Sequence, residues 1–200
     1  MRRFFAFLFG LSVISFFALI LFFQENYLYS ASLHLGMFSL AMFFLWKKDW
    51  KTTLEGIGIP GNLKANIIFT VGGFVGLVCM LIGLFVLAPI IGLENDSAEV
   101  GKIIRGLPFY VPLLAIIIAP ISEELLFRAF LVPRIGIAPA AIAFAVSHLS
   151  YGSAMEIAGA LVVGILFGLL YRASKSVIPC MAVHFAYNLL SILAIMVMAA

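Results

Sequence analysis

The sequence predicts an all-α protein, a polytopic bundle of transmembrane helices. Of its 200 residues, 64% are hydrophobic and only 10% are charged, and the mean hydropathy is +1.21. A soluble globular domain has about 45–50% apolar and about 25% charged residues. The apolar residues also occur in runs of about 20 residues, which is the length that an α-helix needs to cross a bilayer. These observations predict a membrane protein whose backbone polar groups are paired inside helices.

Seven apolar runs define the predicted spans. The first follows Arg2 and Arg3, is longer than the h-region of about 7–15 residues in a signal peptide, and lacks a small-residue cleavage site, so we expect it to be retained. The fifth run is short, which is tolerated inside a membrane where neighbouring helices enclose it. In chain order the runs are residues 4–23, 29–46, 65–89, 107–132, 138–149, 155–171 and 176–198.

The positions of the cations predict an orientation. Cytoplasmic loops of membrane proteins carry an excess of Lys and Arg. The cations here occupy alternate loops, which predicts a cytoplasmic N-terminus and, after seven spans, a C-terminus outside. We expect one membrane domain over residues 1–200, in a prokaryotic plasma membrane, with N-terminal spans and loops in 1–106 and a catalytic core in 107–198. The cations in question are Arg2, Arg3, Lys47, Lys48, Lys51, Arg134, Arg172 and Lys175.

Three charged residues lie inside the fourth apolar run. A charge at the centre of a membrane helix opposes insertion by about 2.5–3.5 kcal/mol, so such residues usually have a use. Glu124 and Arg128 are four residues apart, which places them on one helix face where they can pair. Glu123 is rotated by about 100° from Glu124 and is therefore left to face a cavity.

Polar groups from three predicted spans lie at a similar depth. At about 1.5 Å per residue, Glu123 and His148 each lie about 15 Å from the predicted cytoplasmic ends of their spans. His184 and Asn188 lie about 12 and 18 Å from the start of the last span. This convergence near the membrane midplane predicts one polar site, which we expect to open toward the cytoplasm.

A free carboxylate, two imidazoles and an amide suit hydrolysis by an activated water molecule. Glu123, with His148, is the candidate general base. His184 and Asn188 are the candidates for stabilising the oxyanion of a tetrahedral intermediate. We favour a reaction without a cofactor. Zinc or another divalent metal, held by Glu123, His148 and His184, is the alternative, although the sequence contains no His-Glu-x-x-His.

Other interpretations of the polar residues remain open. Cys180 precedes His184 by one helical turn and could act as a nucleophile, although a buried free cysteine usually behaves as a small hydrophobe. His34, in the second span, is expected to be interfacial or hydrogen-bonded within the bundle. The whole set could instead serve an ion-coupled transporter, although the sequence shows no inverted repeat.

Three motifs together resemble those of the CPBP family, the CAAX prenyl endopeptidases and bacteriocin-processing (Abi) intramembrane proteases. The resemblance covers about residues 107–190, and the motifs lie in separate spans in the family's order. They are Glu123-Glu124-x-x-x-Arg128, Phe144-x-x-x-His148 and His184-x-x-x-Asn188.

The resemblance implies a role for each motif residue. Glu123 would activate water with help from His148, and His184 with Asn188 would form the oxyanion hole. The neighbouring pair, Glu124 and Arg128, would support the site.

The resemblance also implies a class of reaction and of partners. The chain would be an endopeptidase that cleaves a membrane-associated, leader or CAAX-like peptide. Its partners would be that peptide or protein substrate and the lipid bilayer. Nucleic acid is not expected, because the cations lie in short loops between spans. A non-catalytic membrane scaffold or a bacteriocin-immunity protein that keeps the motifs for stability is the alternative.

Overall fold

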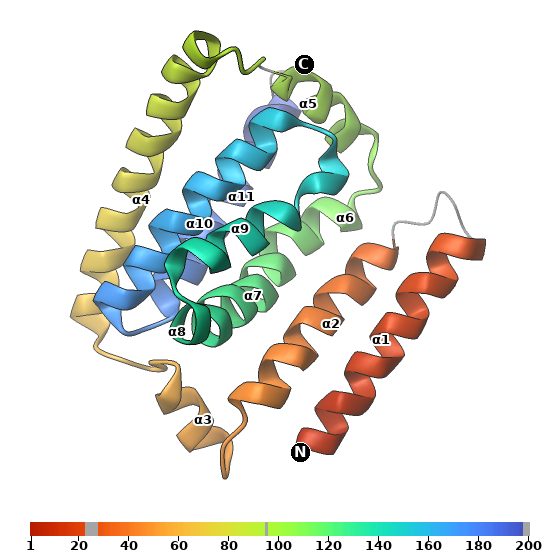
Figure 1. Cartoon of the computed structure of the whole chain (residues 1–200), viewed down its shortest axis with the longest axis vertical. Coiled ribbons are helices and arrows are strands. Elements are labelled where there is room, and N and C mark those ends of the chain that lie inside the picture. Colours follow the sequence, from red (N-terminus) through yellow and green to blue (C-terminus); the bar gives the residue numbers. More distant parts are fainter. Residues whose placement is uncertain (23–27, 95, 198–200) are drawn as a thin grey trace.

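The protein is an all-helical bundle, as the computed structural model shows for residues 1–22, 28–94 and 96–197 (Figure 1). Within these described residues, six helical segments are long and apolar enough to cross a membrane, which confirms the predicted fold class. They are α1 (Arg2–Phe22), α2 (Leu28–Leu45), α4 (Leu63–Leu87) with η1 (Ala88–Ile91), the composite helix Tyr110–Ile135, α10 (Ala154–Ser174) and α11 (Ile178–Val197).

The predicted fifth span is the exception. It contains α9 (Ile137–Val146), which has only 10 residues and therefore rises about 15 Å, half of a hydrocarbon core. Figure 1 shows that the chain still passes from one end of the bundle to the other here, through α9 and the short turn η4 (Leu149–Tyr151). Of the seven expected spans, six are therefore present among the described residues as helical segments long enough to cross a membrane, and the fifth is a shorter apolar helix.

One face of α9 packs closely against α10, whereas Ile142 and Val146 on its other face are more than half exposed, so α9 is not enclosed as we expected of a short span. A Cβ added at Gly164 of α10 would lie 2.9 Å from the Cα of Ala141, so the two backbones can approach this closely only because residue 164 is glycine. A Cβ at Gly168 would likewise lie 2.7 Å from Ile137. The small-residue face of α10 therefore serves close helix packing, as its spacing predicts.

The composite helix is irregular where the site residues lie. It consists of α6 (Tyr110–Leu113), the π-helix η2 (Leu114–Ile118), α7 (Ala119–Glu123), the π-helix η3 (Glu124–Leu131) and α8 (Val132–Ile135). Pro120 and Pro133 have no N–H, so each leaves a carbonyl four residues earlier without its α-helical donor. Those carbonyls belong to the two π segments, and π segments occur frequently at functional sites.

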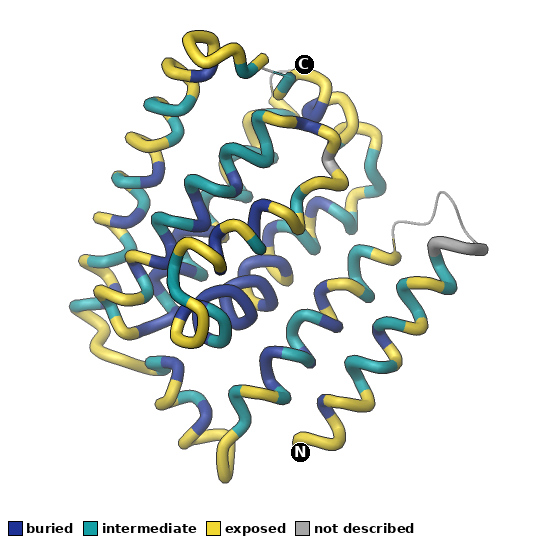
Figure 2. Tube along the Cα trace, in the orientation of Figure 1, coloured by how far each residue is buried: buried dark blue, intermediate teal, exposed yellow. Residues whose placement is uncertain are grey.

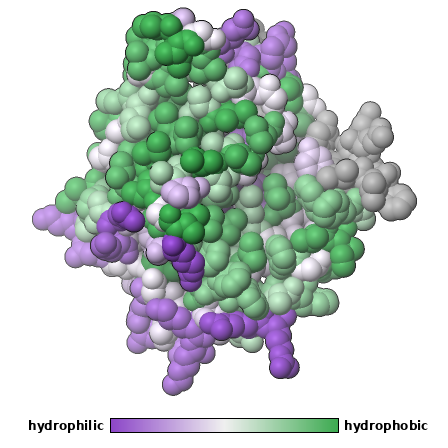
Figure 3. Space-filling model, in the orientation of Figure 1, coloured by the Kyte–Doolittle hydropathy of each residue, from purple (hydrophilic) through white to green (hydrophobic). Residues whose placement is uncertain are grey.

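Two short helices lie at opposite ends of the bundle. Helix α3 (Trp50–Gly56), capped by Asp49, lies at the end that holds the N-terminus, whereas α5 (Ser97–Gly106) lies at the end where α11 ends (Figure 1). Buried residues concentrate in the composite helix and the parts of α9, α10 and α11 that surround it (Figure 2). The face in Figure 3 is largely hydrophobic, with hydrophilic residues at the top, along the bottom and in a group at the left, and an extensive hydrophobic surface is expected for a protein surrounded by lipid.

Candidate active site

Glu123 and Glu124 lie at the junction between α7 and the π-helix η3. Their side chains are almost completely buried, as is that of Arg128 one turn later. Successive residues of a helix point in directions about 100° apart, so the two carboxylates face different neighbours.

The carboxylate of Glu124 has two partners, an ion pair with Arg128 and a hydrogen bond with His184. Its Oε2 lies 3.0 Å from Nε of Arg128, so the pair predicted from the sequence spacing is present. The guanidinium does not meet hydrogen-bond geometry in this pair, and it lies over the ring of Phe144 at 4.3 Å from the centroid. The other oxygen, Oε1, accepts a hydrogen bond of 2.8 Å from Nδ1 of His184.

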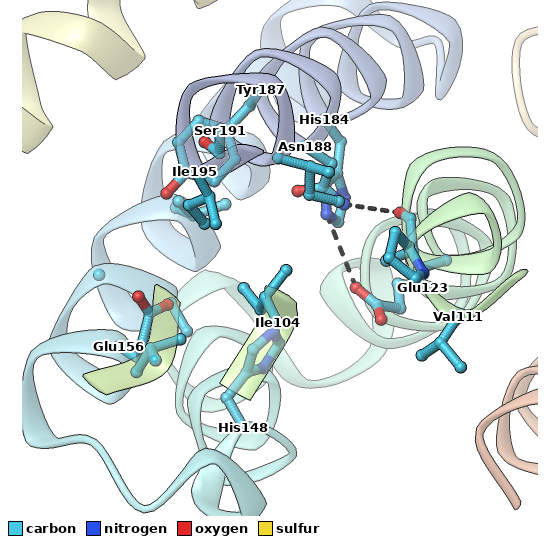
Figure 4. Close-up of a pocket in the computed structure, with 18 of the residues that line it drawn as sticks. Ile104, Val111, Glu123, His148, Glu156, His184, Tyr187, Asn188, Ser191 and Ile195 are labelled. Atoms are coloured by element: carbon cyan, nitrogen blue, oxygen red, sulfur yellow. Dashed lines mark hydrogen bonds and ion pairs between the residues drawn. The ribbon is translucent and has the colours of Figure 1, made fainter. Parts of the chain in front are cut away.

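The contact with Glu124 fixes the roles of the two nitrogens of His184. A carboxylate paired with an arginine is an acceptor, so Nδ1 of His184 carries a proton. Nε2 then faces Glu123, whose Oε2 lies 3.8 Å away (Figure 4). That distance is too long for a direct hydrogen bond, and contacts of this length between polar groups are commonly bridged by water.

The charges of this cluster balance when one more proton is present. Glu123 and Glu124 supply two negative charges, and Arg128 supplies one positive charge. A second proton on His184, or one on Glu123, makes the buried group neutral, and burial strongly favours a neutral group. The site can therefore hold a proton on either side of the gap between Glu123 and His184.

Asn188 lies one turn after His184 on α11. Its Nδ2 donates a hydrogen bond of 2.8 Å to the carbonyl of Ala115, which belongs to the π-helix η2 (Figure 4). An amide nitrogen carries two hydrogens, so a second donor remains on the same atom. Asn188 thus ties α11 to the composite helix and can also donate to a ligand.

His148 follows the end of α9. Its Nδ1 lies 2.9 Å from the carbonyl of Phe144 and 3.2 Å from the hydroxyl of Ser147. Because a carbonyl only accepts, Nδ1 carries the proton in the neutral ring and Nε2 is an acceptor. That tautomer suits a group that receives or orients a proton of water.

Glu123, His148, His184 and Asn188 all line one cavity of about 420 Å³. Figure 4 shows their side chains around the same space. The volume is within the range of about 300–1,000 Å³ typical of ligand pockets. The structure therefore brings together the four residues that depth alone predicted to meet.

The position of the cavity bears on the expected direction of its opening. Its lining comes from the half of the bundle that holds α5 and the C-terminus, and includes Val100 and Ile104 of α5. We expected a cytoplasmic N-terminus together with a site that opens toward the cytoplasm. The N-terminus and α5 lie at opposite ends of the bundle (Figure 1), so the position of the lining does not favour these two expectations together, and both stay predictions.

Sequence reasoning missed the position of His34. This residue on α2 is buried, lines the cavity, and has its Nδ1 3.0 Å from Oγ of Ser122 and 3.9 Å from Oε1 of Glu123. Of the two expectations for His34, the hydrogen bond within the bundle is confirmed. The available signal was the rarity of an ionisable residue inside a span.

Cys180 lies outside the cavity. It is fully buried, and its thiol donates to the carbonyl of Phe167 at 3.4 Å. The cysteine therefore packs as a small hydrophobe and is not placed to attack a substrate in the cavity.

The metal alternative is not supported by preformed geometry. Across the described part of the chain, no three His, Cys, Asp or Glu residues are grouped closely enough to hold a metal ion. The candidate ligands Glu123, His148 and His184 share the cavity without forming such a group.

Comparison with known proteins supports the resemblance seen in the motifs. Residues 105–190 match the family model described as type II CAAX prenyl endopeptidase Rce1-like. No curated protein and no solved structure matches the chain. The matched segment contains all six motif residues that carry charge or hydrogen bonds at the site, and it leaves α1, α2, α3 and α4 outside. Over residues 105–190 the chain therefore resembles the Rce1-like type II CAAX prenyl endopeptidases, consistent with the CPBP family, and at family level this supports an intramembrane endopeptidase.

Proposed function

We propose that the protein is an intramembrane endopeptidase that cleaves a peptide bond with a water molecule activated by Glu123. The observation that carries this proposal is the cavity that Glu123, His148, His184 and Asn188 line together. These residue types supply a base, donors for an oxyanion and a place to hold a proton.

The first step is attack on the substrate carbonyl. Water placed between Glu123 and His148 gives a proton to the Glu123 carboxylate as its oxygen bonds to the carbonyl carbon. The neutral His148 ring, with Nδ1 held by the Phe144 carbonyl, presents Nε2 to the same water and orients it.

The negative charge formed on the substrate oxygen needs donors. The second N–H of Asn188 is one, and Nε2 of His184 is another when that ring carries both protons. Glu124 stabilises this charged ring through Nδ1. Collapse of the intermediate then breaks the C–N bond, and the proton held by Glu123 passes to the leaving amine.

Comparison of membrane peptides from cells that express wild-type protein or Glu123→Gln tests this proposal by mass spectrometry. We expect one or more peptides that end at a defined bond in wild-type cells and are missing from the variant. Glu99→Gln is the matched control, because Glu99 is an exposed carboxylate on α5 that pairs only with exposed Lys102 in the described structure.

Identical peptide inventories at equal protein levels would contradict peptidase activity and favour a non-catalytic membrane scaffold. A difference that also appears in Glu99→Gln would point to expression rather than catalysis. The peptide identified in this way supplies the sequence for a quenched fluorescent reporter used in the kinetic experiments below.

A further inference from the structure

The cavity occupies one half of the bundle only. From α11 it takes residues at and after His184, and from α10 it takes residues up to Val163. From the composite helix it takes residues up to Glu123. The described helices that run through both halves of the bundle thus line the cavity only with the portions that lie near α5. Glu123 and His184 are at the inner end of this lining, and we call them the floor of the cavity.

The layer beneath this floor is closed. Four side chains in this layer are each at most 2% exposed, namely Phe144, Phe167, Cys180 and Val183. The guanidinium of Arg128 lies over the rings of Phe144 and Phe167. Beneath this floor the cavity therefore does not continue toward the end of the bundle that holds the N-terminus.

The surface charges distinguish the two ends of the bundle. The sequence has 12 Lys and Arg residues, of which Arg128 is buried at the site and only Lys102 and Arg105 lie at the α5 end. At that end, described carboxylates outnumber these cations and comprise Glu94, Asp96, Glu99 and Glu156. The remaining nine cations lie at the end that holds the N-terminus and α3, namely Arg2, Arg3, Lys47, Lys48, Lys51, Lys64, Arg134, Arg172 and Lys175.

We propose that the catalytic cavity opens on the extracytoplasmic side of the membrane and receives peptide segments that have already crossed it. The basic end of a membrane protein faces the cytoplasm, and here the cavity opens at the other end. The identity of the substrate as a peptide rests on the proposed function, whereas the direction of opening rests on geometry and charge alone.

The depth of the site restricts the form of the substrate. Glu123 lies 13 residues beyond Tyr110, or about 20 Å below the α5 end of the composite helix. An extended chain covers about 3.3 Å per residue, so at least about six residues must enter without folding. An unfolded leader or tail on the outer side meets this requirement, and a folded domain does not.

Cysteine labelling with a membrane-impermeant maleimide tests the direction of opening. We expect Glu99→Cys, exposed on α5, to be labelled in right-side-out vesicles, and Lys51→Cys, exposed on α3, only in inverted vesicles. Wild-type protein is the baseline, because Cys79 and Cys180 both lie within spans. The opposite labelling pattern would overturn the proposal.

A cleavage assay in oriented vesicles tests the direction of opening separately from the peptidase activity. The fluorescent reporter peptide, added outside, should be cleaved by right-side-out vesicles and not by sealed inverted vesicles. Cleavage by inverted vesicles alone would overturn the outward opening while leaving peptidase activity intact. Absence of cleavage in both preparations and in detergent would count against the peptidase, and the labelling result would still decide the direction of opening.

His34 supports Glu123 from a helix outside the segment that matches the protease family. The hydroxyl of Ser122 has one hydrogen, which it donates to the carbonyl of Ile118 at 3.1 Å or of Ala119 at 3.2 Å. Its contact of 3.0 Å with His34 therefore runs the other way, with Nδ1–H of His34 donating to Ser122.

The two oxygens of Glu123 lie between two imidazoles. Oε1 is 3.9 Å from the Nδ1–H of His34, and Oε2 is 3.8 Å from Nε2 of His184. From these contacts we infer that His34 is a positioning residue, which acts on the Glu123 carboxylate through its hydrogen bond to the adjacent Ser122 and through water in the 3.9 Å gap to Oε1. The inference rests on the proposed function, since it assigns His34 to the reaction of Glu123.

Three substitutions distinguish positioning from a merely structural role. The amide nitrogen of asparagine can occupy the place of Nδ1, so His34→Asn retains the donor, whereas His34→Ala and His34→Gln remove it from that place. We expect kcat on the reporter to fall about 10–100-fold in His34→Ala and His34→Gln, with KM nearly unchanged, and to recover largely in His34→Asn, as for other groups that orient a catalytic side chain.

Equal kcat in wild type and His34→Ala would overturn this role. An equally large fall in kcat in His34→Asn and in His34→Ala would also overturn it. That result would mean that the donor retained in His34→Asn does not matter, as expected if the substitutions only disturb packing. Thermal unfolding of each variant in detergent accompanies the kinetics. A wild-type protein without activity on the reporter would be a failure of the proposed function and would leave no kcat for His34 to change.

Discussion

Glu123→Gln is expected to reduce kcat for cleavage of the reporter peptide by about 10²–10⁴-fold, the contribution of a general base. Glutamine keeps the size of the side chain but cannot accept a proton from water. KM is expected to change little, because the rest of the cavity is retained. Single-turnover assays in detergent with the fluorescent reporter provide the measurement.

The variant should remain folded, and this makes the result interpretable. Glu124, Arg128 and the Nδ1 contact of His184 do not involve Glu123, so the ion pair that closes the floor persists. A neutral side chain at position 123 also removes one negative charge from a buried cluster. We therefore expect the Tm of Glu123→Gln to equal or exceed that of wild type. Full activity in Glu123→Gln would exclude the proposed base.

The residues that meet at the site could be predicted from the sequence because depth in a membrane is measurable along a helix. A rise of about 1.5 Å per residue brought Glu123, His148, His184 and Asn188 to one level without any structure. The pairing of Glu124 with Arg128 followed from helical spacing in the same way. Depth and helical spacing can both be counted along the sequence. The structure places the four residues around one cavity and pairs Glu124 with Arg128.

The direction of each side chain could not be predicted in this way. The π segments before and after α7 change the residue-to-residue rotation, so a count of 100° per residue does not give the contacts of Glu124 with His184. The position of His34 depends on how α2 packs against the composite helix, which no local pattern encodes. The opening of the cavity depends on which half of the bundle is filled by large side chains such as Phe144 and Phe167.

The short fifth span is packed on one side only. Helix α9, of 10 residues, lies against α10 at Gly164 and Gly168, and its opposite face is exposed at Ile142 and Val146. His148 lies just where this helix has ended, so the short span also delivers an imidazole to the middle of the bundle.

Arg128→Met is expected to be the most destabilising substitution at the site. Arg128 is 1% exposed, and its guanidinium compensates the fully buried carboxylate of Glu124. Removing one partner of a buried ion pair leaves an uncompensated charge and costs about 3–5 kcal/mol. The guanidinium also lies over the rings of Phe144 and Phe167, and methionine retains only the apolar part of those contacts.

A double substitution isolates the charge from the packing. Arg128→Met combined with Glu124→Gln removes both charges, so it should recover a large part of the stability lost in Arg128→Met alone, because a buried pair can be replaced by neutral groups at little cost. Thermal unfolding of purified protein in one detergent measures each step. Arg134→Met is the matched control on the same composite helix, since the Arg134 side chain is exposed at the end of the bundle. It should change stability by less than about 1 kcal/mol.

The activity of the double variant separates support from catalysis. If Glu124 and Arg128 serve only to hold His184, the stable double variant should lose kcat without losing the fold, because the glutamine amide does not stabilise a doubly protonated His184. A double variant that is both stable and fully active would show that the ion pair has no part in the reaction. A double variant no more stable than Arg128→Met would show instead that the aromatic packing of the guanidinium, and not its charge, holds the floor of the cavity together.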